Sequence, residues 1–412
     1  MRRVIEPGAG LRAGFAALPR ALNRNTVVTA AVAILFSIAG PALIYVSVAE
    51  QLGFTAAQTS SWLFGAYAVA GLIGIVLAPY YQMPIVGAAC IPGASLLATA
   101  LAGHSFAEAV GAYVASGALV LLIGISGLAS RVMALVPLPI VMGMVAGCMM
   151  NFGTGIVSGT SAMPLVCGAA VIGYFALPRV LKKVPPVPAS LLCALLALLL
   201  TGGFETANLS FSFSAPLFTL PRFSPGTLLS VSVPLAVLVV GAQNAQAIGV
   251  LRAQGYTPPV GAMTVASGVA SMAAGLFGGH NANIAGPMTA ICASGDADPD
   301  PAKRFGAAFA CGVFSILFGV FSGVALGLIS AIPVPVTTVL AGLAMISVLV
   351  SSLTEAFGSA THLRGAFVAL VVGLSGVTLL GVGAAFWALV FGSAASLLSG
   401  EGKSPLEAGK RL

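Results

Sequence analysis

Residues 107–127 read AEAVGAYVASGALVLLIGISG, and residues 302–322 read AKRFGAAFACGVFSILFGVFS. Aligned at an offset of 195, the two stretches share seven residues in twenty-one positions, and both are apolar enough to cross a bilayer. Each is followed by a Pro-x-Pro, at 137–139 and at 333–335, which counts against chance alignment of two Ala/Gly-rich segments. The sequence therefore predicts a membrane protein of two related halves, an arrangement that usually holds a solute between them.

The composition excludes a soluble protein. Hydrophobic residues make up 58% of the chain and charged residues 7%, whereas soluble domains carry about 25% charge. The six cysteines are scattered through apolar segments without a C-x-x-C, so we expect packing residues and neither a disulfide framework nor a metal site. The apolar run at 26–48 is longer than the core of a signal peptide and indicates an uncleaved first span.

Hydropathy predicts about fourteen spans. They are 26–48, 58–79, 84–102, 108–128, 134–156, 162–180, 186–203, 227–250, 259–277, 281–295, 303–327, 333–353, 361–379 and 381–399. Seven spans per half is an odd number, so the second half must enter the membrane from the opposite face. The predicted fold class is an all-α polytopic membrane protein with a seven-plus-seven inverted repeat.

The distribution of positive charge supports this topology. With the N-terminus inside, 16 of the 17 Lys and Arg residues fall on the inner side, and only Arg222 lies outside. Such a bias follows the positive-inside rule, so we read the net charge of +7 as a topology signal and not as a sign of nucleic-acid binding. Both termini are predicted to be cytoplasmic.

The helical pattern breaks in the third and tenth spans. Residues 84–90 lead into a helix-forming run that contains Pro92, and residues 278–284 lead into Pro287, again 195 residues later. Because proline suits the first turn of a helix, we expect two half-helices that start near mid-membrane after short extended stretches. Their free N–H groups would favour an anion such as a carboxylate. An ordinary pair of kinked helices is the alternative.

Polar side chains gather in the same region. The eighth span carries Gln243, Asn244 and Gln246, and the tenth begins with His280, Asn281 and Asn283. Buried amides cost free energy unless they are bonded, so they face a cavity or hydrogen-bond between helices. The first span adds Ser37, a kink at Gly40-Pro41, and Tyr45.

Titratable groups are scarce inside the spans. Glu50, Glu108 and Glu355 lie at or near span ends, which leaves His280 as the candidate for proton coupling. A structural histidine is the alternative, with a weak-acid substrate carrying the proton itself. The run 296–301 lacks the glycine and closing glutamate of a calcium loop, so it predicts a turn with Asp300 as a helix N-cap.

Several motifs together resemble the bacterial benzoate–proton symporters. The most specific are Asn283-Ile-Ala, Thr289-Ala-Ile-Cys-Ala, Asp298-Pro-Asp-Pro-Ala-Lys-Arg304, and Gln243-Asn244 followed by Val250-Leu-Arg-Ala-Gln-Gly-Tyr-Thr-Pro258. Ser61-Trp62, Met83-Pro84 and Pro92-Gly93-Ala94 are similar to that family's first half, and the motifs span nearly the whole chain in the same order. Gly286-Pro287 and Gly40-Pro41 depart from the family's pattern, which puts the identity of the substrate in question more than the fold.

The resemblance implies a core domain that moves against a gate domain. The expected division is a cytoplasmic segment 1–25, core 26–130, gate 131–203, outer linker 204–226, core 227–330, gate 331–399 and a cytoplasmic tail 400–412. It also implies a transporter, not an enzyme, in a bacterial inner membrane, with homodimers common in the wider fold. The implied activity is import of benzoate or a similar aromatic carboxylate by proton symport, without a cofactor or a metal.

The resemblance also implies where the substrate binds: between spans three and ten, beside spans one and eight. The candidate residues are Ser37, Tyr45, Cys90, Gly93, Ser95, Gln243, Asn244, Asn281, Asn283 and Pro287, with His280 for proton coupling. Two alternatives stay open, a same-fold carrier of a nucleobase or an aliphatic organic anion, and a passive anion channel. An enzyme is disfavoured because the sequence shows no nucleophile, metal cluster or cofactor motif.

Overall fold

The structure is a computed structural model that describes residues 5–128, 137–181, 184–203, 215–329 and 331–401. Residues 204–214 of the predicted linker 204–226, and most of the predicted tail 400–412, therefore lie outside the described residues. The described part is mostly helical, with one pair of two-residue strands.

The first half begins with an additional helix and continues through seven spans. Its elements are α1 (Leu11–Ala21); α2 (Arg24–Ser37), η1 (Ile38–Ala42) and α3 (Leu43–Gln51); α4 (Ala56–Phe64), η2 (Gly65–Val69) and α5 (Ala70–Tyr81); β1 (Gly87–Ala88) and α6 (Ile91–Ala100); α7 (Phe106–Ser126); α9 (Leu138–Ala162); α10 (Pro164–Val180); and α11 (Pro186–Thr201).

The second half follows the same plan. Its elements are α12 (Pro225–Thr227), η4 (Leu228–Ser232), α13 (Val233–Leu238), η5 (Val239–Asn244) and α14 (Ala245–Ala253); α15 (Val260–Leu276); β2 (Asn283–Ile284) and α16 (Gly286–Cys292); η6 (Pro301–Lys303), α17 (Phe305–Val320) and α18 (Ser322–Ile329); α19 (Val334–Phe357); α20 (Leu363–Ser375); and α21 (Ala384–Leu398).

The fourteen predicted spans are confirmed as elements, although some boundaries differ. Within the described residues, seven continuous helices are long and apolar enough to cross a membrane, and six shorter apolar helices and α16 occupy the other positions. The helix of the fifth predicted span, 134–156, runs from Leu138 to Ala162, so it continues past the predicted end. The Gly, Ser and Thr residues at its end lower the hydropathy of the segment, but they continue the helix.

The matching glycines of the two quoted stretches explain why those stretches resemble each other. A Cβ atom on Gly117 of α7 would lie 2.6 Å from the backbone nitrogen of Met272 on α15. A Cβ on Gly312 of α17 would lie 2.6 Å from the carbonyl oxygen of Gly71 on α5. The fourth span (α7) therefore packs closely against the ninth (α15), and the eleventh span (α17) packs in the same way against the second (α5). Small residues at both crossings let the backbones approach closely.

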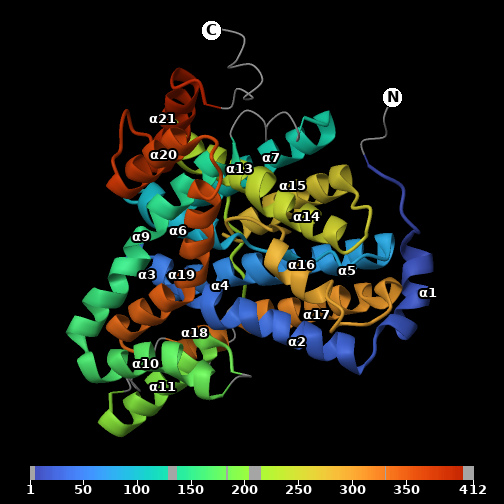
Figure 1. Ribbon diagram of the computed structural model, residues 1–412, viewed down its shortest axis with the longest axis horizontal. Coiled ribbons are helices and arrows are strands. Elements are labelled where there is room, and N and C mark those ends of the chain that lie inside the picture. Colours follow the sequence, from blue (N-terminus) through green and yellow to red (C-terminus); the bar gives the residue numbers. More distant parts are fainter. Residues whose placement is uncertain (1–4, 129–136, 182–183, 204–214, 330, 402–412) are drawn as a thin grey trace.

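The helices form two groups, which Figure 1 shows on opposite sides of the molecule. The half-helix bundle comprises α2–α7 with α13–α17, and it contains the contacts of α7 with α15 and of α17 with α5 and α2. The long-helix bundle comprises α9–α11 and α19–α21, in which α9 packs against both α19 and α20. The two bundles meet where α3 and η1 contact α19 and where α6 contacts α9.

The predicted extended stretches pair with each other in the middle of the half-helix bundle. β1 runs antiparallel to β2, with Gly87 opposite Ile284 and Ala88 opposite Asn283. Gly87 is required because a Cβ there would lie 2.1 Å from the carbonyl oxygen of Ala70. The pairing satisfies backbone groups that a broken span would otherwise leave unbonded in the membrane. It brings the starts of α6 and α16 together.

The segment Asp298–Arg304 ties several spans of the half-helix bundle together. Asp300 accepts a hydrogen bond from the Ala302 backbone N–H at 3.0 Å, which confirms its predicted role as an N-cap. Arg304 is buried and donates to the carbonyl oxygens of Asp298, at 2.7 Å, and Ala293, at 2.8 Å. The carboxylate of Asp298 in turn accepts from the amide of Asn23, at 2.7 Å. The segment is therefore a structural clasp.

The helix α1 was not predicted. It packs against α5 and α17, and Phe15 meets Phe309 edge-on with ring centroids 6.0 Å apart. A Cβ on Gly14 would lie 2.1 Å from the carbonyl oxygen of Pro79, so the helix lies directly on the end of α5. Glu6, just before it, accepts hydrogen bonds from the N–H groups of Gly261 and Ala262 and so caps α15.

Candidate functional site

A cavity of about 190 Å³ lies between the two bundles. This volume is below the range of about 300–1,000 Å³ that is usual for drug-sized ligands, so it suits a small solute. The half-helix bundle contributes Phe36, Ser37, Pro41, Ala88, Ala89, Ile91, Pro92, Gln243, Gln246, Ala285, Pro287 and Met288. The long-helix bundle contributes Met142 from α9 and Ser347, Val348, Ser351, Ser352 and Glu355 from α19.

The start of α6 forms one edge of the cavity. Cys90 is the N-cap, and its sulfur accepts a hydrogen bond from the Gly93 N–H at 3.2 Å. Pro92 stands in the first turn, as predicted, and the N–H of Ile91 has no partner among the described residues. Because the first N–H groups of a helix carry a partial positive charge, this edge favours an anion or a polar oxygen.

Two glutamine amides face the same space. Gln243 and Gln246 are three residues apart on η5 and α14, and both line the cavity. A Cβ on Gly286 would lie 2.3 Å from the Gln246 side-chain oxygen, so the absence of a side chain there lets this amide lie against the start of α16. The glycine that departs from the family's pattern thus has a physical role beside the cavity.

The polar face of α19 is the part of the lining that sequence reasoning missed. Ser347, Ser351 and Glu355 are spaced four residues apart, so they lie on one face of the helix. The Ser351 hydroxyl donates to the Glu355 carboxylate at 3.4 Å. The four-residue spacing of polar residues in an otherwise apolar helix is the signal that could have identified this face.

His280 lies behind the cavity wall and does not line it. Its Nδ1 accepts a hydrogen bond from Trp62 Nε1, at 2.9 Å, and its Nε2 lies 2.8 Å from the carbonyl oxygen of Cys90. An indole N–H can only donate, so the network assigns the ring proton to Nε2, which donates to Cys90. The ring is therefore held as the neutral tautomer with both nitrogens bonded, an arrangement typical of a structural histidine.

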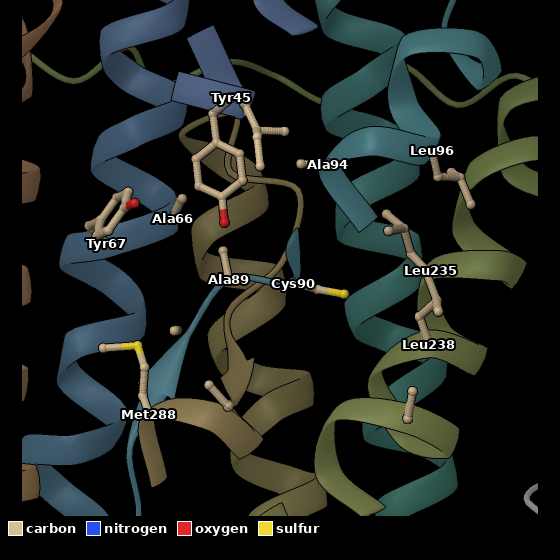
Figure 2. Close-up of a cluster of buried hydrophobic side chains, with 14 of the residues drawn as sticks. Tyr45, Ala66, Tyr67, Ala89, Cys90, Ala94, Leu96, Leu235, Leu238 and Met288 are labelled. Atoms are coloured by element: carbon tan, nitrogen blue, oxygen red, sulfur yellow. The ribbon is translucent and has the colours of Figure 1, made fainter. Parts of the chain in front are cut away.

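Tyr45 also lies behind the cavity wall, next to His280 and Trp62. Its ring stacks on Trp62 with centroids 5.9 Å apart and meets His280 edge-on at 5.4 Å. Figure 2 shows the ring of Tyr45 pointing toward the Ala89–Cys90 segment that leads into α6. This aromatic layer supports the extended backbone in front of it.

The three asparagines hold backbone and helices in place. Asn281 accepts from the Cys90 N–H at 2.9 Å, and Asn283 donates to the Ile284 carbonyl at 2.9 Å. Asn244 accepts from the Ser267 hydroxyl at 3.1 Å and so links η5 to α15. None of the three lines the cavity, and each keeps one buried amide atom without a partner among the described residues.

The remaining predicted residues divide between the wall and the layer behind it. Ser95 donates to the Ile91 carbonyl within α6, and a Cβ on Gly93 would lie 2.8 Å from Leu235. Of the predicted site residues, the structure brings Ser37, Gln243 and Pro287 to the cavity; the others support it from behind. Among the described residues no group of three or more His, Cys, Asp or Glu side chains is placed to hold a metal ion.

Comparisons with known proteins agree with this architecture. A family model described as "Benzoate membrane transport protein" matches residues 20–398. The chain is 32% identical to "Inner membrane protein YdcO" of Escherichia coli (strain K12), over 89% of this chain and 94% of that one. It is 28% identical to "Benzoate membrane transport protein" of Acinetobacter baylyi, over 87% of this chain and 91% of that one.

Solved structures share the fold at low sequence identity. The transmembrane domain of the cyanobacterial bicarbonate transporter BicA superposes with a TM-score of 0.58 at 14% identity, over 91% of this chain and 96% of that one. The murine anion transporter Slc26a9, solved in an inward-facing state, gives a TM-score of 0.59 at 11% identity, over 94% of this chain and 70% of that one. These likenesses confirm the seven-plus-seven inverted repeat.

Proposed function

The chain belongs to the benzoate membrane transport protein family and is a multi-pass membrane transporter, and on this premise we propose that it carries benzoate or a similar aromatic carboxylate by proton symport. One observation carries the choice of solute. The cavity combines apolar walls with uncharged hydrogen-bond donors at the start of a half-helix. An anion that carries a flat, apolar ring matches both features.

The apolar part of the cavity suits an aromatic ring. Phe36 and Pro41 come from the first span, Met288 from α16 and Met142 from α9. Aromatic rings and thioethers pack favourably against a ring, and methionine adapts its shape to the solute. Burial of the ring from several sides supplies most of the affinity.

The polar part suits a carboxylate that must also be released. The amides of Gln243 and Gln246 and the free N–H of Ile91 are all neutral donors. Among the described lining residues there is no lysine or arginine. Hydrogen bonds between neutral donors and a carboxylate are weaker than the bidentate pair with a guanidinium, so they allow binding and release in each cycle.

The positions of two cavities support a core-against-gate motion. A second cavity of about 320 Å³ lies between the same bundles and is lined by Ser47, Gln51 and Thr99 on one side and Asn151 on the other. The two spaces are separated where Gly40 of η1 meets Ala344 of α19; a Cβ on Gly40 would lie 2.9 Å from the Ala344 Cβ. We propose that the half-helix bundle is the core and slides along the long-helix gate, so that the site opens alternately at either end.

We propose that the first cavity lies at the cytoplasmic end of the protein. The positive-inside rule supports this, because the first cavity, compared with the second, lies toward the Arg24 end of the first span and toward the end of α19, which Arg364 follows. We propose that both termini lie on the cytoplasmic side of a bacterial inner membrane and that the protein assembles as a homodimer.

Uptake by purified protein in proteoliposomes tests the proposal. Labelled benzoate should accumulate inside vesicles when the outside is acidified, and the accumulation should collapse when a protonophore removes the pH gradient. Uptake that never exceeds the outside concentration would indicate a passive channel. No benzoate uptake, together with competitor-sensitive uptake of a nucleobase or an aliphatic acid, would reject the aromatic carboxylate as substrate.

A further inference from the structure

The helix α1 lies across the ends of three spans of the half-helix bundle, and Figure 1 shows it at the edge of the molecule beside α5 and α17. The N–H of Gly10, just before α1, donates to the carbonyl oxygen of Tyr80 at the end of α5, at 3.1 Å. A Cβ on Gly306, at the start of α17, would lie 2.2 Å from the carbonyl oxygen of Ala21. Glu6 reaches the start of α15.

The length and place of α1 set its depth in the membrane. With 11 residues it measures about 16 Å, which is too short to cross a hydrocarbon core of about 30 Å. Spans end at the membrane surface, so a helix that lies across their ends is at that level. Tyr80 and Tyr81, an adjacent pair at the end of α5, fit this level, since tyrosine is enriched at the interface between membrane and water.

Three faces of α1 lie in different surroundings. The face toward the spans consists of the buried residues Gly14, Leu18 and Ala21. The next face holds Leu11 and Phe15, four residues apart, which are 43% and 45% exposed. Phe15 also meets the partly exposed Phe309 edge-on, so this apolar face continues onto the side of α17. An exposed apolar face that continues onto a membrane span is suited to lipid.

The third face of α1 is basic. Arg12 and Arg20, eight residues apart, are both exposed, and neither makes an ion pair among the described residues. The acidic groups around the helix have other partners. Glu6 accepts from two backbone N–H groups of α15, and Asp300, on the segment before α17, lies 3.6 Å from Lys303. Arginines without a partner, next to an exposed apolar face, are suited to anionic headgroups.

We propose that α1 is an interfacial helix that binds anionic phospholipids of the bilayer. Leu11 and Phe15 enter the boundary between the acyl chains and the headgroups, and Arg12 and Arg20 bind the phosphate groups at that level. A bilayer surface covers both faces at once, whereas a soluble anion would leave the apolar face uncovered. The bound lipids hold the ends of α5, α15 and α17 at one depth in the membrane. This binding is independent of the solute that the protein carries.

Thermal unfolding of the purified full chain in neutral detergent, titrated with phosphatidylglycerol or with phosphatidylcholine, tests the inference. We expect phosphatidylglycerol to raise the wild-type melting temperature more than phosphatidylcholine does. In Arg12→Gln/Arg20→Gln, the phosphatidylglycerol concentration that gives half of the increase should rise by about tenfold or more, because each arginine beside an anionic surface contributes about fivefold to binding. The matched control is Arg179→Gln/Arg364→Gln, which removes two exposed arginines of the long-helix bundle and should respond as the wild type does.

Tryptophan probes test the orientation of the helix. In Phe15→Trp, phospholipids brominated on their acyl chains should quench the added tryptophan, measured as the difference from the wild type. Ala16→Trp is the matched probe, because Ala16 is exposed and lies four residues from both Arg12 and Arg20 on the basic face. Its added tryptophan should be quenched by aqueous iodide and less by the brominated lipids.

An unchanged response of Arg12→Gln/Arg20→Gln to phosphatidylglycerol would overturn the inference. An equal loss of response in the control pair would also overturn it, because the effect would then depend on net charge alone. A lower melting temperature of the α1 variant before any lipid is added would assign the arginines a structural role instead. Equal quenching by brominated lipid at positions 15 and 16 would reject the orientation, and protection of position 15 from both quenchers would show that protein and not lipid covers α1.

Discussion

Replacing His280 tests whether this side chain has a structural role or couples transport to protons. The ring accepts from Trp62 and donates to Cys90 at 2.9 and 2.8 Å, and it is completely buried. In His280→Ala, the Trp62 N–H and the Cys90 carbonyl both lose their partner. A buried polar group left unbonded costs about 1–3 kcal/mol, so two of them cost roughly 4 kcal/mol, before the cavity left by the ring is counted.

The expected result is a strong loss of stability without a specific loss of proton coupling. His280→Gln keeps a donor toward Cys90 and should cost about half as much, roughly 2 kcal/mol. His104→Ala is the matched control, because that side chain lies near the surface between α6 and α7. Unfolding in detergent gives the stability, and proteoliposome uptake against pH gives the coupling. A His280→Gln protein that melts like the wild type but no longer accumulates solute would refute this reasoning.

The remaining predictions concern packing, the cavity and the structural clasp at Asp298–Arg304. Gly312→Val should prevent the close crossing with Gly71, where a Cβ would lie 2.6 Å from the carbonyl oxygen, and should lower the yield of folded protein in the membrane. Gln246→Leu should raise the Kd for solute by about tenfold or more at unchanged melting temperature, since it removes a charge-assisted hydrogen bond of about 1.5–3 kcal/mol. Asn244→Leu should do the reverse, lowering the melting temperature with little change in the Kd of the protein that stays folded. Arg304→Met should cost roughly 3 kcal/mol in detergent unfolding, because its carbonyl partners stay buried without a donor; equal stability would refute the clasp.

Much of the architecture followed from local properties of the chain. A run of about twenty apolar residues is enough to predict a span, and the charges between spans are enough to orient it. Pro92 and Pro287 marked the starts of two half-helices because proline restricts its own backbone whatever surrounds it. The repeat at 195 residues then indicated that these starts meet, and the antiparallel pairing of β1 with β2 confirmed it.

The tertiary structure decided which polar side chains face the cavity. Gln243 and Asn244 are adjacent in sequence, yet the first lines the cavity and the second bonds to Ser267 behind it. Residues 239–244 are π-helical, and the extra residue in each such turn rotates the following side chains away from the faces that a regular helix predicts. No local pattern reports that rotation.

The tertiary structure also supplied the opposite wall. Glu355 and the serines of α19 are more than a hundred residues from Gln243, and near a span end they look like ordinary solvated groups. They face the cavity only because the long-helix bundle packs across the half-helices. Hydropathy and charge are properties of a segment by itself, whereas the lining of a cavity is a property of two segments in contact. The sequence alone therefore determined the spans and their breaks, and only the packing decided where a solute can bind.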